Sequence, residues 1–515
     1  MNGAESLIRT AVAAGVEVCF ANPGTTEMPL VIALDTVPGM RAVLGLFEGA
    51  CTGAADGYGR MSGKPALTLL HLGPGFANGI ANLHNARRAR SPIVNLIGDH
   101  ATWHVGYDAP LTSDIVSLAK PVSAWVHTTR TANETARDGA EAIAAAIRYP
   151  GHVATLIVPS DCQQGESAGP LAPHPRQAAA SVPESALSDS VTALRSGKPA
   201  ALLLGGPALL ERGLRAGATI AASTGCRLLC DTFPARLERG AGLPLVEKLP
   251  YFPEQAIEML SRFAFLILAG TSAPVSFFGY PGIPSRLTPA ECAPVVLSRP
   301  DEDTVGALEA LAGRLNAGKD KGIAVSAGRP ARPVGALTPR SLGEAVAALQ
   351  PEGTIIMDEG ATSGLPHFLV SAGAPRFTYL TITGGAIGQG LPCATGAAMA
   401  CPDRRVVALQ ADGSGMYTLQ ALWTQAREGL DVTTIVCANR SYRVLRVELA
   451  RAGVTEPGPQ ALALTDLTRP VIDWVELARG MGVRAARVET ADALVLEFER
   501  ALAEPGPNLI EAILP

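Results

Sequence analysis

The chain has 515 residues, which is too long for one hydrophobic core and suggests about three domains of ordinary size. Hydrophobic residues make up 47% of it and aromatic residues only 5%, and there are 54 glycines, a composition that suits closely packed helices and buried strands. The net charge of −5 gives no basic footprint, so nucleic acid is excluded as an expected partner.

Cysteine usage and the first segment indicate the compartment. The nine cysteines are scattered without a paired framework, so we expect reduced thiols. The first 20 residues carry Glu5 and Arg9 within a short amphipathic helix, which argues against a signal peptide. No uninterrupted apolar run approaches membrane-spanning length. We therefore predict a cytoplasmic protein without a membrane partner.

The first region, residues 1–165, alternates strands and helices. Its four strand-like apolar runs, each separated by a helix-length segment, are Val16–Ala21, Ala42–Phe47, Ala66–Leu72 and Ile93–Ile97. This rhythm predicts a parallel sheet with helices on both faces.

Two Pro- and Ala-rich stretches, 165–183 and 325–339, have linker composition. The region between them, 184–325, repeats the α/β pattern, with strands near Ala200–Leu204, Arg227–Leu229, Phe265–Leu268 and Val295–Leu297. The third region, 340–515, ends in a strand at Asn508–Leu514. We predict an α/β fold of three doubly wound parallel-sheet domains.

Residues 404–442 of the third region read as a strand, a tight turn, a helix and a strand. Two apolar runs, Val406–Leu409 and Val432–Val436, flank a segment with helical spacing. Asp412 is predicted to end the first strand and Asn439 the second. Both are therefore expected at the carboxyl edge of the sheet, where open α/β folds bind ligands.

The turn Asp412-Gly413-Ser414-Gly415 is predicted to open the helix, whose free N–H groups attract an anion. Oxygen side chains beside a phosphate-sized anion suit Mg²⁺, whereas Asp-Gly-Ser alone is a common turn. The spacing from Asp412 to Asn439 resembles the diphosphate–Mg²⁺ motif of thiamine-diphosphate enzymes. Ala411 and Arg440 depart from the glycines usual in that motif, but neither change removes a presumed oxygen ligand.

Glu48 lies where a predicted strand turns into a helix of small residues. A carboxylate at a helix N-terminus is favourable against the helix dipole and is often no more than that. The run from Glu48 to Tyr58, followed by Lys64-Pro65, resembles the segment that supplies the cofactor-activating glutamate in thiamine-diphosphate enzymes. The resemblance favours the functional interpretation.

Motifs along the whole chain resemble the superfamily of acetolactate synthase, benzoylformate decarboxylase and 2-hydroxyacyl-CoA lyase. They are Asn22–Glu27, Glu48, His71–Gly75 with Asn78, Gly384–Gly388, and Asp412–Tyr442. The resemblance implies three domains: a pyrimidine-binding domain at 1–165, a central domain at 184–325 and a diphosphate-binding domain at 340–515. It further implies a homo-oligomer, usually a tetramer, with thiamine diphosphate and Mg²⁺ bound between two chains.

The same resemblance implies roles for individual residues. Glu48 is implied to hydrogen-bond the pyrimidine ring, Gly385 to accept from its amine through the carbonyl, and Ile387 to support the bent cofactor. The implied Mg²⁺ ligands are Asp412, Asn439 and the carbonyl of Ser441. The other positions implied to bind the cofactor are Asn78, Ala361, Thr362, Gly413, Ser414 and Tyr442.

His71 bears on the reaction. A histidine at the end of a buried strand is usually a structural residue. Here the position resembles that of the active-site histidine of benzoylformate decarboxylase-like members, which acetolactate synthases generally lack. With Thr25, it is implied to orient a substrate carboxylate and to move protons. His100 and His104 are weaker candidates, and Phe277 with Phe278 either walls the pocket or packs a domain interface.

The resemblance implies a 2-keto acid substrate that loses CO₂ to give an enamine. Protonation of the enamine gives an aldehyde, which the match at His71 favours. The alternative is a carboligase, in which a second carbonyl compound captures the enamine, as in acetolactate formation. A further alternative is a non-catalytic cofactor-binding homologue, against which the presence of Glu48 argues. We predict a lyase of the decarboxylase type, with the carboligase transferase left open.

Overall fold

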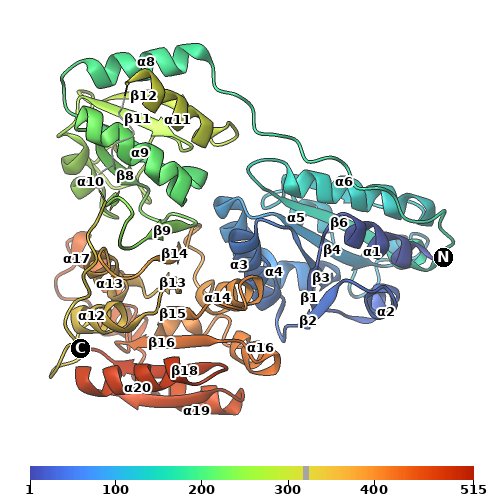
Figure 1. The fold of residues 1–515 in the computed structure, drawn as a ribbon. Helices are drawn as coiled ribbons and strands as arrows, with labels where there is room; N and C mark the ends of the chain where they lie inside the picture. The colour runs from blue at the N-terminus through green and yellow to red at the C-terminus, as the bar shows by residue number, and fades with distance from the viewer. Residues whose placement is uncertain (317–323) are drawn as a thin grey trace. The chain divides into compact units, whose positions relative to one another are not determined.

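The structure is a computed structural model that describes residues 1–316 and 324–515 (Figure 1). The chain forms two compact units, which are described separately. The first unit comprises residues 1–177, 331–369 and 382–515, and the second comprises 178–330 and 370–381. Every residue predicted to be catalytic or to bind the cofactor belongs to the first unit.

The N-terminal part of the first unit is built on a six-stranded parallel sheet of order β2-β1-β3-β4-β6-β5. Its strands are β1 (Val18–Asn22), β2 (Arg41–Leu44), β3 (Ala66–His71), β4 (Ile93–Asp99), β5 (Trp125–Thr128) and β6 (Val153–Pro159). The predicted parallel α/β fold is therefore confirmed. The second strand ends three residues earlier than predicted, because Phe47 already caps the following helix.

Helices cover both faces of this sheet. Its helices are α1 (Gly3–Ala13), α2 (Met28–Thr36), α3 (Glu48–Ser62), α4 (Leu72–Ala89), α5 (Ile115–Ala119), α6 (Thr135–Ile147) and α7 (Ser160–Gln164). Successive side chains of a strand point to opposite faces, so Leu69 of β3 packs in the core under α1, α2 and α6, while Leu70 packs in the core under α3, α4 and α5. The sheet is doubly wound.

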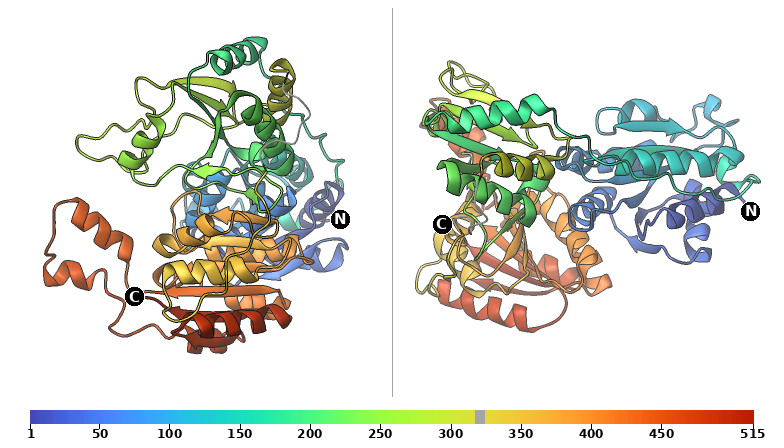
Figure 2. Two further views of the ribbon diagram at one scale, coloured as in Figure 1. Left: turned by 60° about the vertical axis from the view of Figure 1, so that its left-hand side comes forward. Right: turned by 45° about the horizontal axis from the view of Figure 1, so that its top comes forward.

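In the C-terminal part of the first unit, parallel strands follow one another in the order β17-β18-β16-β15-β13. They are β13 (Ile355–Glu359), β15 (Val406–Ala411), β16 (Val432–Ala438), β17 (Arg484–Val488) and β18 (Asn508–Ile513). The helices around them are α12 (Pro339–Leu349), α14 (Gly390–Ala400), α15 (Asp412–Gly415), α16 (Ala421–Glu428), α19 (Trp474–Gly480) and α20 (Ala491–Ala503). Two further helices, α17 (Arg443–Arg451) and α18 (Pro459–Ala463), extend away from this sheet and contain no buried residue (Figure 2).

Helices α3 and α14 approach each other closely because glycines line their contact. A Cβ atom added at Gly57 would overlap the carbonyl oxygen of Cys393, and one added at Gly396 would overlap the carbonyl oxygen of Ala54. Backbone therefore meets backbone here, which requires residues without a side chain. The contact joins the helix that begins at Glu48 to the helix that follows the Gly384–Gly388 loop.

The second unit has its own five-stranded parallel sheet, of order β10-β8-β7-β11-β12. The strands are β7 (Ala200–Leu204), β8 (Arg227–Cys230), β10 (Glu247–Lys248), β11 (Phe265–Ala269) and β12 (Ala293–Ser298). The helices are α8 (Glu184–Arg195), α9 (Glu211–Thr224), α10 (Pro253–Leu260) and α11 (Thr304–Arg314). In the same unit, β14 (Phe377–Thr381) pairs antiparallel with β9 (Leu237–Arg239). All four predicted strands of this region are present.

All nine cysteines are free, and eight of them are buried. Within residues 1–316 and 324–515, no helix is long and apolar enough to cross a bilayer.

Candidate active site

His71 ends β3 and is held by a buried carboxylate from the turn that follows β1, the strand next to β3. Its Nδ1 atom lies 2.8 Å from Oε2 of Glu27, which is fully buried. Because a carboxylate only accepts, we assign the proton to Nδ1, which leaves Nε2 to take up or release a proton. Glu27 also accepts from the backbone N–H of Gly24 at 2.7 Å and from the hydroxyl of Thr26 at 2.7 Å.

Gly24 is required beside this pair, because a Cβ atom there would overlap the His71 ring. Thr26 lies 3.3 Å from Nδ1 of His71, whereas Thr25, the residue predicted from the sequence, is exposed. Glu27 belongs to the motif Asn22–Glu27, but no role was predicted for it. Its place beside His71 follows from the pairing of β1 with β3, which brings the turn after β1 beside the end of β3 and which one sequence does not specify.

Glu48 begins α3 and is 8% exposed. Its Oε2 atom accepts a hydrogen bond from Nδ2 of Asn78 at 2.9 Å. Gly75 leaves room for the other oxygen, since an added Cβ there would lie 2.9 Å from Oε1 of Glu48. The structure thus brings two predicted site residues, Glu48 and Asn78, into direct contact.

The loop 383–388 is held by side chains of α4. His84 Nε2 lies 3.1 Å from the carbonyl of Gly384, Asn85 donates to the carbonyl of Ala386 at 2.7 Å, and Asn82 donates to the carbonyl of Gly388 at 3.3 Å. None of the described residues donates to the carbonyl of Gly385, which is exposed. That carbonyl is therefore left available to a ligand.

Asn82 also connects the loop to the helix of Glu48. The same Nδ2 group donates to the carbonyl of Gly49 at 2.8 Å and to that of Gly388 at 3.3 Å. Asn82 is 2% exposed, so this bridge is shielded from water. Within one chain, the bridge fixes the residue after Ile387 relative to the residue after Glu48.

Asp412 is the first residue of α15, and β15 ends at Ala411, one residue earlier than predicted. Its carboxylate accepts from the N–H of Gly413 at 2.8 Å and from the N–H of Arg440 at 2.6 Å. Burial raises its pKa above the ordinary value. A nearby cation would relieve that cost, because an opposite charge favours the ionised form.

The helix predicted to begin at Asp412 is interrupted. The short α15 ends at Gly415, and α16 begins at Ala421, so Met416 and Leu419 precede the second helix. The segment between the two helices is held by a distant loop, because the hydroxyl of Thr418 donates a hydrogen bond to the carbonyl of Gly388 at 2.8 Å.

Asn439 and Ser441 follow β16, beside Asp412. Oδ1 of Asn439 accepts from the N–H of Ser441 at 3.1 Å. The bridge between Ser441 and Asp466 uses the carbonyl of Arg440 and the N–H of Tyr442, which leaves the Ser441 carbonyl unused by it. The hydroxyl oxygen of Ser441 is buried, and no described residue forms a hydrogen bond with it.

These groups fit a hard cation. One carboxylate, one amide oxygen and one backbone carbonyl are oxygen donors of the kind that Mg²⁺ takes together with phosphate oxygens. The described part of the chain holds no cluster of three or more His, Cys, Asp or Glu arranged for a metal, so a metal here would depend on this mixed set. Tyr442 closes one side, because an added Cβ at Gly413 would lie 2.5 Å from its ring.

Ala361 and Thr362 are exposed in a short 3-10 turn that closely follows β13. Strand β13 pairs with β15 in the register Glu359 to Gln410. The turn and the Asp412–Ser414 segment therefore leave adjacent strands at the same edge of the sheet.

The weaker candidates lie in aromatic clusters. His100 and His104 stack edge to face, with ring centroids 5.3 Å apart, and His104 contacts Trp103 and Tyr107. Phe277 and Phe278 contact each other at 5.0 Å within the second unit, where Phe277 also packs on Phe233 and Tyr251. Their predicted place at the site stays a prediction.

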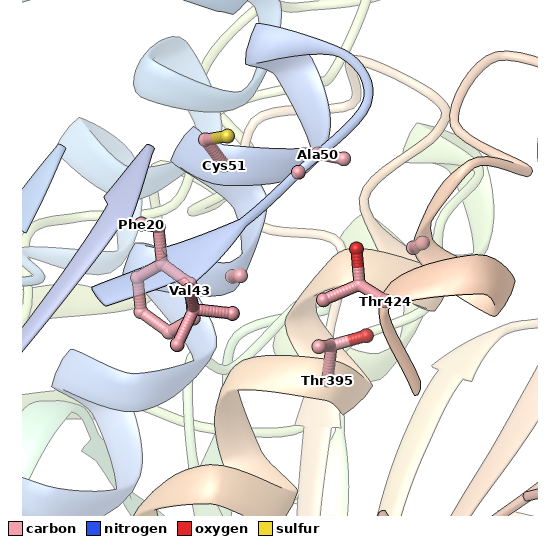
Figure 3. Close-up of a pocket in the computed structure, with 9 residues that line it drawn as sticks. Phe20, Val43, Ala50, Cys51, Thr395 and Thr424 are labelled. Carbon is pink, nitrogen blue, oxygen red and sulfur yellow. The ribbon is translucent and has the colours of Figure 1, made fainter. Parts of the chain in front are cut away.

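A small cavity lies beside α3 in the first unit (Figure 3). It is lined by Phe20, Val43, Gly45, Ala50, Cys51, Ala54, Thr395, Ala421 and Thr424. Burial raises the pKa of the Cys51 thiol, so the thiolate form is disfavoured. The lining is mainly apolar, which fits a packing space better than a site for a charged ligand.

Comparison with known families defines the class. Residues 1–118 match the thiamine pyrophosphate enzyme N-terminal TPP binding domain, and residues 360–512 match the thiamine pyrophosphate enzyme C-terminal TPP binding domain. The chain belongs to the thiamine pyrophosphate enzymes, in the superfamily that includes acetolactate synthase and benzoylformate decarboxylase.

Individual relatives cover the whole chain. It is 52% identical to a Mycobacterium tuberculosis protein provisionally named acetolactate synthase large subunit IlvX, over 100% of this chain and 99% of the relative. It is 31% identical to benzoylformate decarboxylase of Pseudomonas aeruginosa, over 96% of each chain. The solved structure of the thiamine diphosphate-dependent 4-hydroxybenzoylformate decarboxylase of Rhodococcus jostii RHA1 is 25% identical, with a TM-score of 0.88 over 100% of this chain and 99% of that one.

Proposed function

We propose that this protein catalyses the thiamine-diphosphate- and Mg²⁺-dependent, non-oxidative decarboxylation of a 2-keto acid. The observation that carries the proposal is the pairing of His71 with the buried Glu27 at 2.8 Å. A histidine oriented by a carboxylate, with its second nitrogen unbonded, is suited to general acid–base catalysis. Similarity to decarboxylases over the whole chain supports the same reaction.

The residues around the site fit the cofactor. We assign binding of the cofactor's pyrimidine ring to Glu48, Asn78 and the carbonyl of Gly385, and Ile387 would support the cofactor from the same loop as Gly385. Asp412, Asn439 and the Ser441 carbonyl would hold Mg²⁺. The residues assigned to the diphosphate are Ala361, Thr362, Gly413, Ser414 and Tyr442. When bound, thiamine diphosphate supplies a carbon centre that adds to the keto group and accepts the electron pair released with CO₂.

The protein's own groups would position the reactants and move protons. The carboxyl of Glu48, held by Asn78, would share a proton with the pyrimidine ring. Nε2 of His71 would deliver the proton that completes the aldehyde, and Glu27 would stabilise the imidazolium. Thr25 would help to orient the substrate carboxylate from the turn beside His71.

A second candidate function is carboligation, in which a second carbonyl compound takes the place of the proton. The observation that favours it is the 52% identity to the relative provisionally named as an acetolactate synthase large subunit. In that reaction His71 would be a pocket residue and would donate no proton to the product.

We further propose a cytoplasmic homo-oligomer, a tetramer by family analogy, with the site completed between two chains. The family generally forms oligomers that act on small molecules, which supports this assembly. Size-exclusion chromatography with light scattering tests it, and a monomer at micromolar concentration would contradict it.

The reaction itself is tested with the purified protein, thiamine diphosphate, Mg²⁺ and a panel of 2-keto acids that includes pyruvate and benzoylformate. Mass spectrometry identifies the products. Aldehyde as the main product would support the decarboxylase, and a condensed hydroxy ketone would establish the carboligase. Cofactor binding without product from any acid would point to the non-catalytic homologue.

A further inference from the structure

Glu359 is a buried carboxylate with no role in the steps described above. It ends β13 and is 3% exposed. No Lys or Arg among residues 1–316 and 324–515 forms an ion pair with it, so its charge is balanced by hydrogen bonds alone. A buried carboxylate without a cation is costly and is kept only where its donors are well placed.

The donors to Glu359 come from the predicted cofactor segments. The N–H of Gly388 donates to Oε1 at 2.6 Å, and the N–H of Gly390 donates to Oε2. The amide of Gln410 donates to Oε2 at 3.3 Å and to the hydroxyl of Ser414 at 2.7 Å. One carboxylate therefore holds the loop that follows Ile387 and, through Gln410, the turn that follows Asp412.

The backbone at this contact has little freedom to rearrange. Gly388 has a φ of +94°, a conformation that L side chains rarely adopt. An added Cβ at Gly390 would overlap Oε1 of Gln410 and would lie 2.8 Å from Oε2 of Glu359. On the other side, the side chain of Gln389 donates to the buried Asp56, which is paired with Arg60 at 2.7 Å. Two buried carboxylates thus hold three consecutive residues.

We propose that Glu359 is a positioning residue for the cofactor. It fixes the backbone after Ile387 and the diphosphate turn in one arrangement before the cofactor arrives. Ordering these segments in advance lowers the entropy lost on binding, so the free enzyme binds more tightly. This inference rests on the cofactor site of the proposed function.

The test is the affinity of the variant Glu359→Gln for thiamine diphosphate with Mg²⁺, measured by isothermal titration calorimetry. Glutamine keeps the size of the side chain but turns one acceptor into a donor, so an N–H of Gly388 or Gly390 loses its partner. We expect the dissociation constant of the variant for thiamine diphosphate to be at least tenfold larger than that of the wild type. At saturating cofactor, we expect kcat and the KM for the keto acid to stay within twofold of wild type.

Two variants serve as comparisons. Glu489→Gln changes an exposed carboxylate of the same unit and is expected to bind the cofactor as wild type does. Glu359→Asp keeps the charge but withdraws it by one methylene, and is expected to restore part of the affinity. A merely structural defect would lower the number of binding sites and the unfolding temperature without this graded change in affinity.

An affinity of Glu359→Gln within twofold of wild type would overturn the proposal. If that variant does not fold, the cofactor affinity of Gln410→Leu tests the proposal instead. This substitution removes the hydrogen bonds from Gln410 to Glu359 and Ser414 and leaves the carboxylate in place. Threefold or greater weakening supports the proposal, and unchanged affinity overturns it. Wild-type protein that binds no cofactor would instead contradict the proposed function itself.

Discussion

At the residue scale, Glu27 is placed to orient His71 and does not contact the segments assigned to the diphosphate. Glu27 is fully buried and accepts from Gly24, Thr26 and His71. None of these groups belongs to the segments assigned to the diphosphate. A change at Glu27 should therefore affect proton transfer without affecting the retention of the cofactor.

We expect Glu27→Gln to lower kcat for aldehyde formation by about 10- to 100-fold, because a neutral amide stabilises the imidazolium of His71 less than a carboxylate does. Steady-state kinetics gives the rate and calorimetry the cofactor affinity, which should stay unchanged. His71→Gln should cause a loss of similar or greater size. A Glu27→Gln enzyme with wild-type kcat would remove Glu27 from the mechanism.

Substitutions at Glu48 and Asp412 should affect different steps, activation of the cofactor and its binding. Glu48→Gln is expected to abolish exchange of the thiazolium C2 proton while diphosphate binding stays largely intact. Asp412→Ala is expected to weaken retention of the cofactor itself, because the proposed Mg²⁺ ligand is removed. Proton exchange followed by NMR and binding followed by calorimetry separate the two effects. Full turnover by Glu48→Gln would show that the assignment of Glu48 is wrong.

Glu359 gives a prediction for stability against pH. Burial raises its pKa from 4.5 to about 7, so between these values the folded chain holds a proton that the unfolded chain has released. Stability contributed by this residue therefore falls as pH rises through that window, by about 3 kcal/mol in total. Glu359→Gln cannot titrate, so its stability relative to wild type should improve from pH 4.5 to pH 8. Denaturant unfolding of both proteins at each pH measures the difference, and a constant difference would contradict the prediction.

At the scale of elements, the strands were predictable and the polar contacts between elements were not. Apolar β-branched runs mark β15 and β16 within one or two residues, because a buried parallel strand needs such side chains on both faces. The break between α15 and α16 was missed, since Thr418 bonds to Gly388, which is distant in sequence. The same holds for Asn82, whose two acceptors lie in different domains of the predicted architecture.

The contact between α3 and α14 predicts the effect of a single methyl group. Gly57→Ala would drive Cβ into a backbone carbonyl, and overpacking of this kind costs about 1–3 kcal/mol or more. Gly313→Ala in α11 is the matched control, because an added Cβ there meets nothing within 4 Å and alanine favours a helix by about 1 kcal/mol. Thermal unfolding should show a lower midpoint for the first variant and an unchanged or higher one for the second. Equal midpoints would refute close packing at Gly57.

At the scale of the whole molecule, the order of motifs along the chain carried most of the information. Glycine turns, Glu48 and the Asp412–Asn439 spacing predict the family from the sequence alone, and the comparisons confirm that assignment. The role of Glu27 and the buried position of Glu359 depend on strand neighbours, which one sequence does not specify. The predicted domain boundaries at 165, 184, 325 and 340 stay predictions.

The glycine-lined contact of α3 with α14 also limits how such a protein can diverge. Where backbone touches backbone, any added side chain is destabilising, so the frame that carries Glu48 and the loop after Gly384 is expected to change little under selection. Loops that leave the strand ends face no such restriction, and the segment with the exposed Trp103 and Tyr107 is one of them. New substrate preferences should therefore arise in these loops, and a saturation library screened for activity would find its tolerated positions there and none at Gly57 or Gly396.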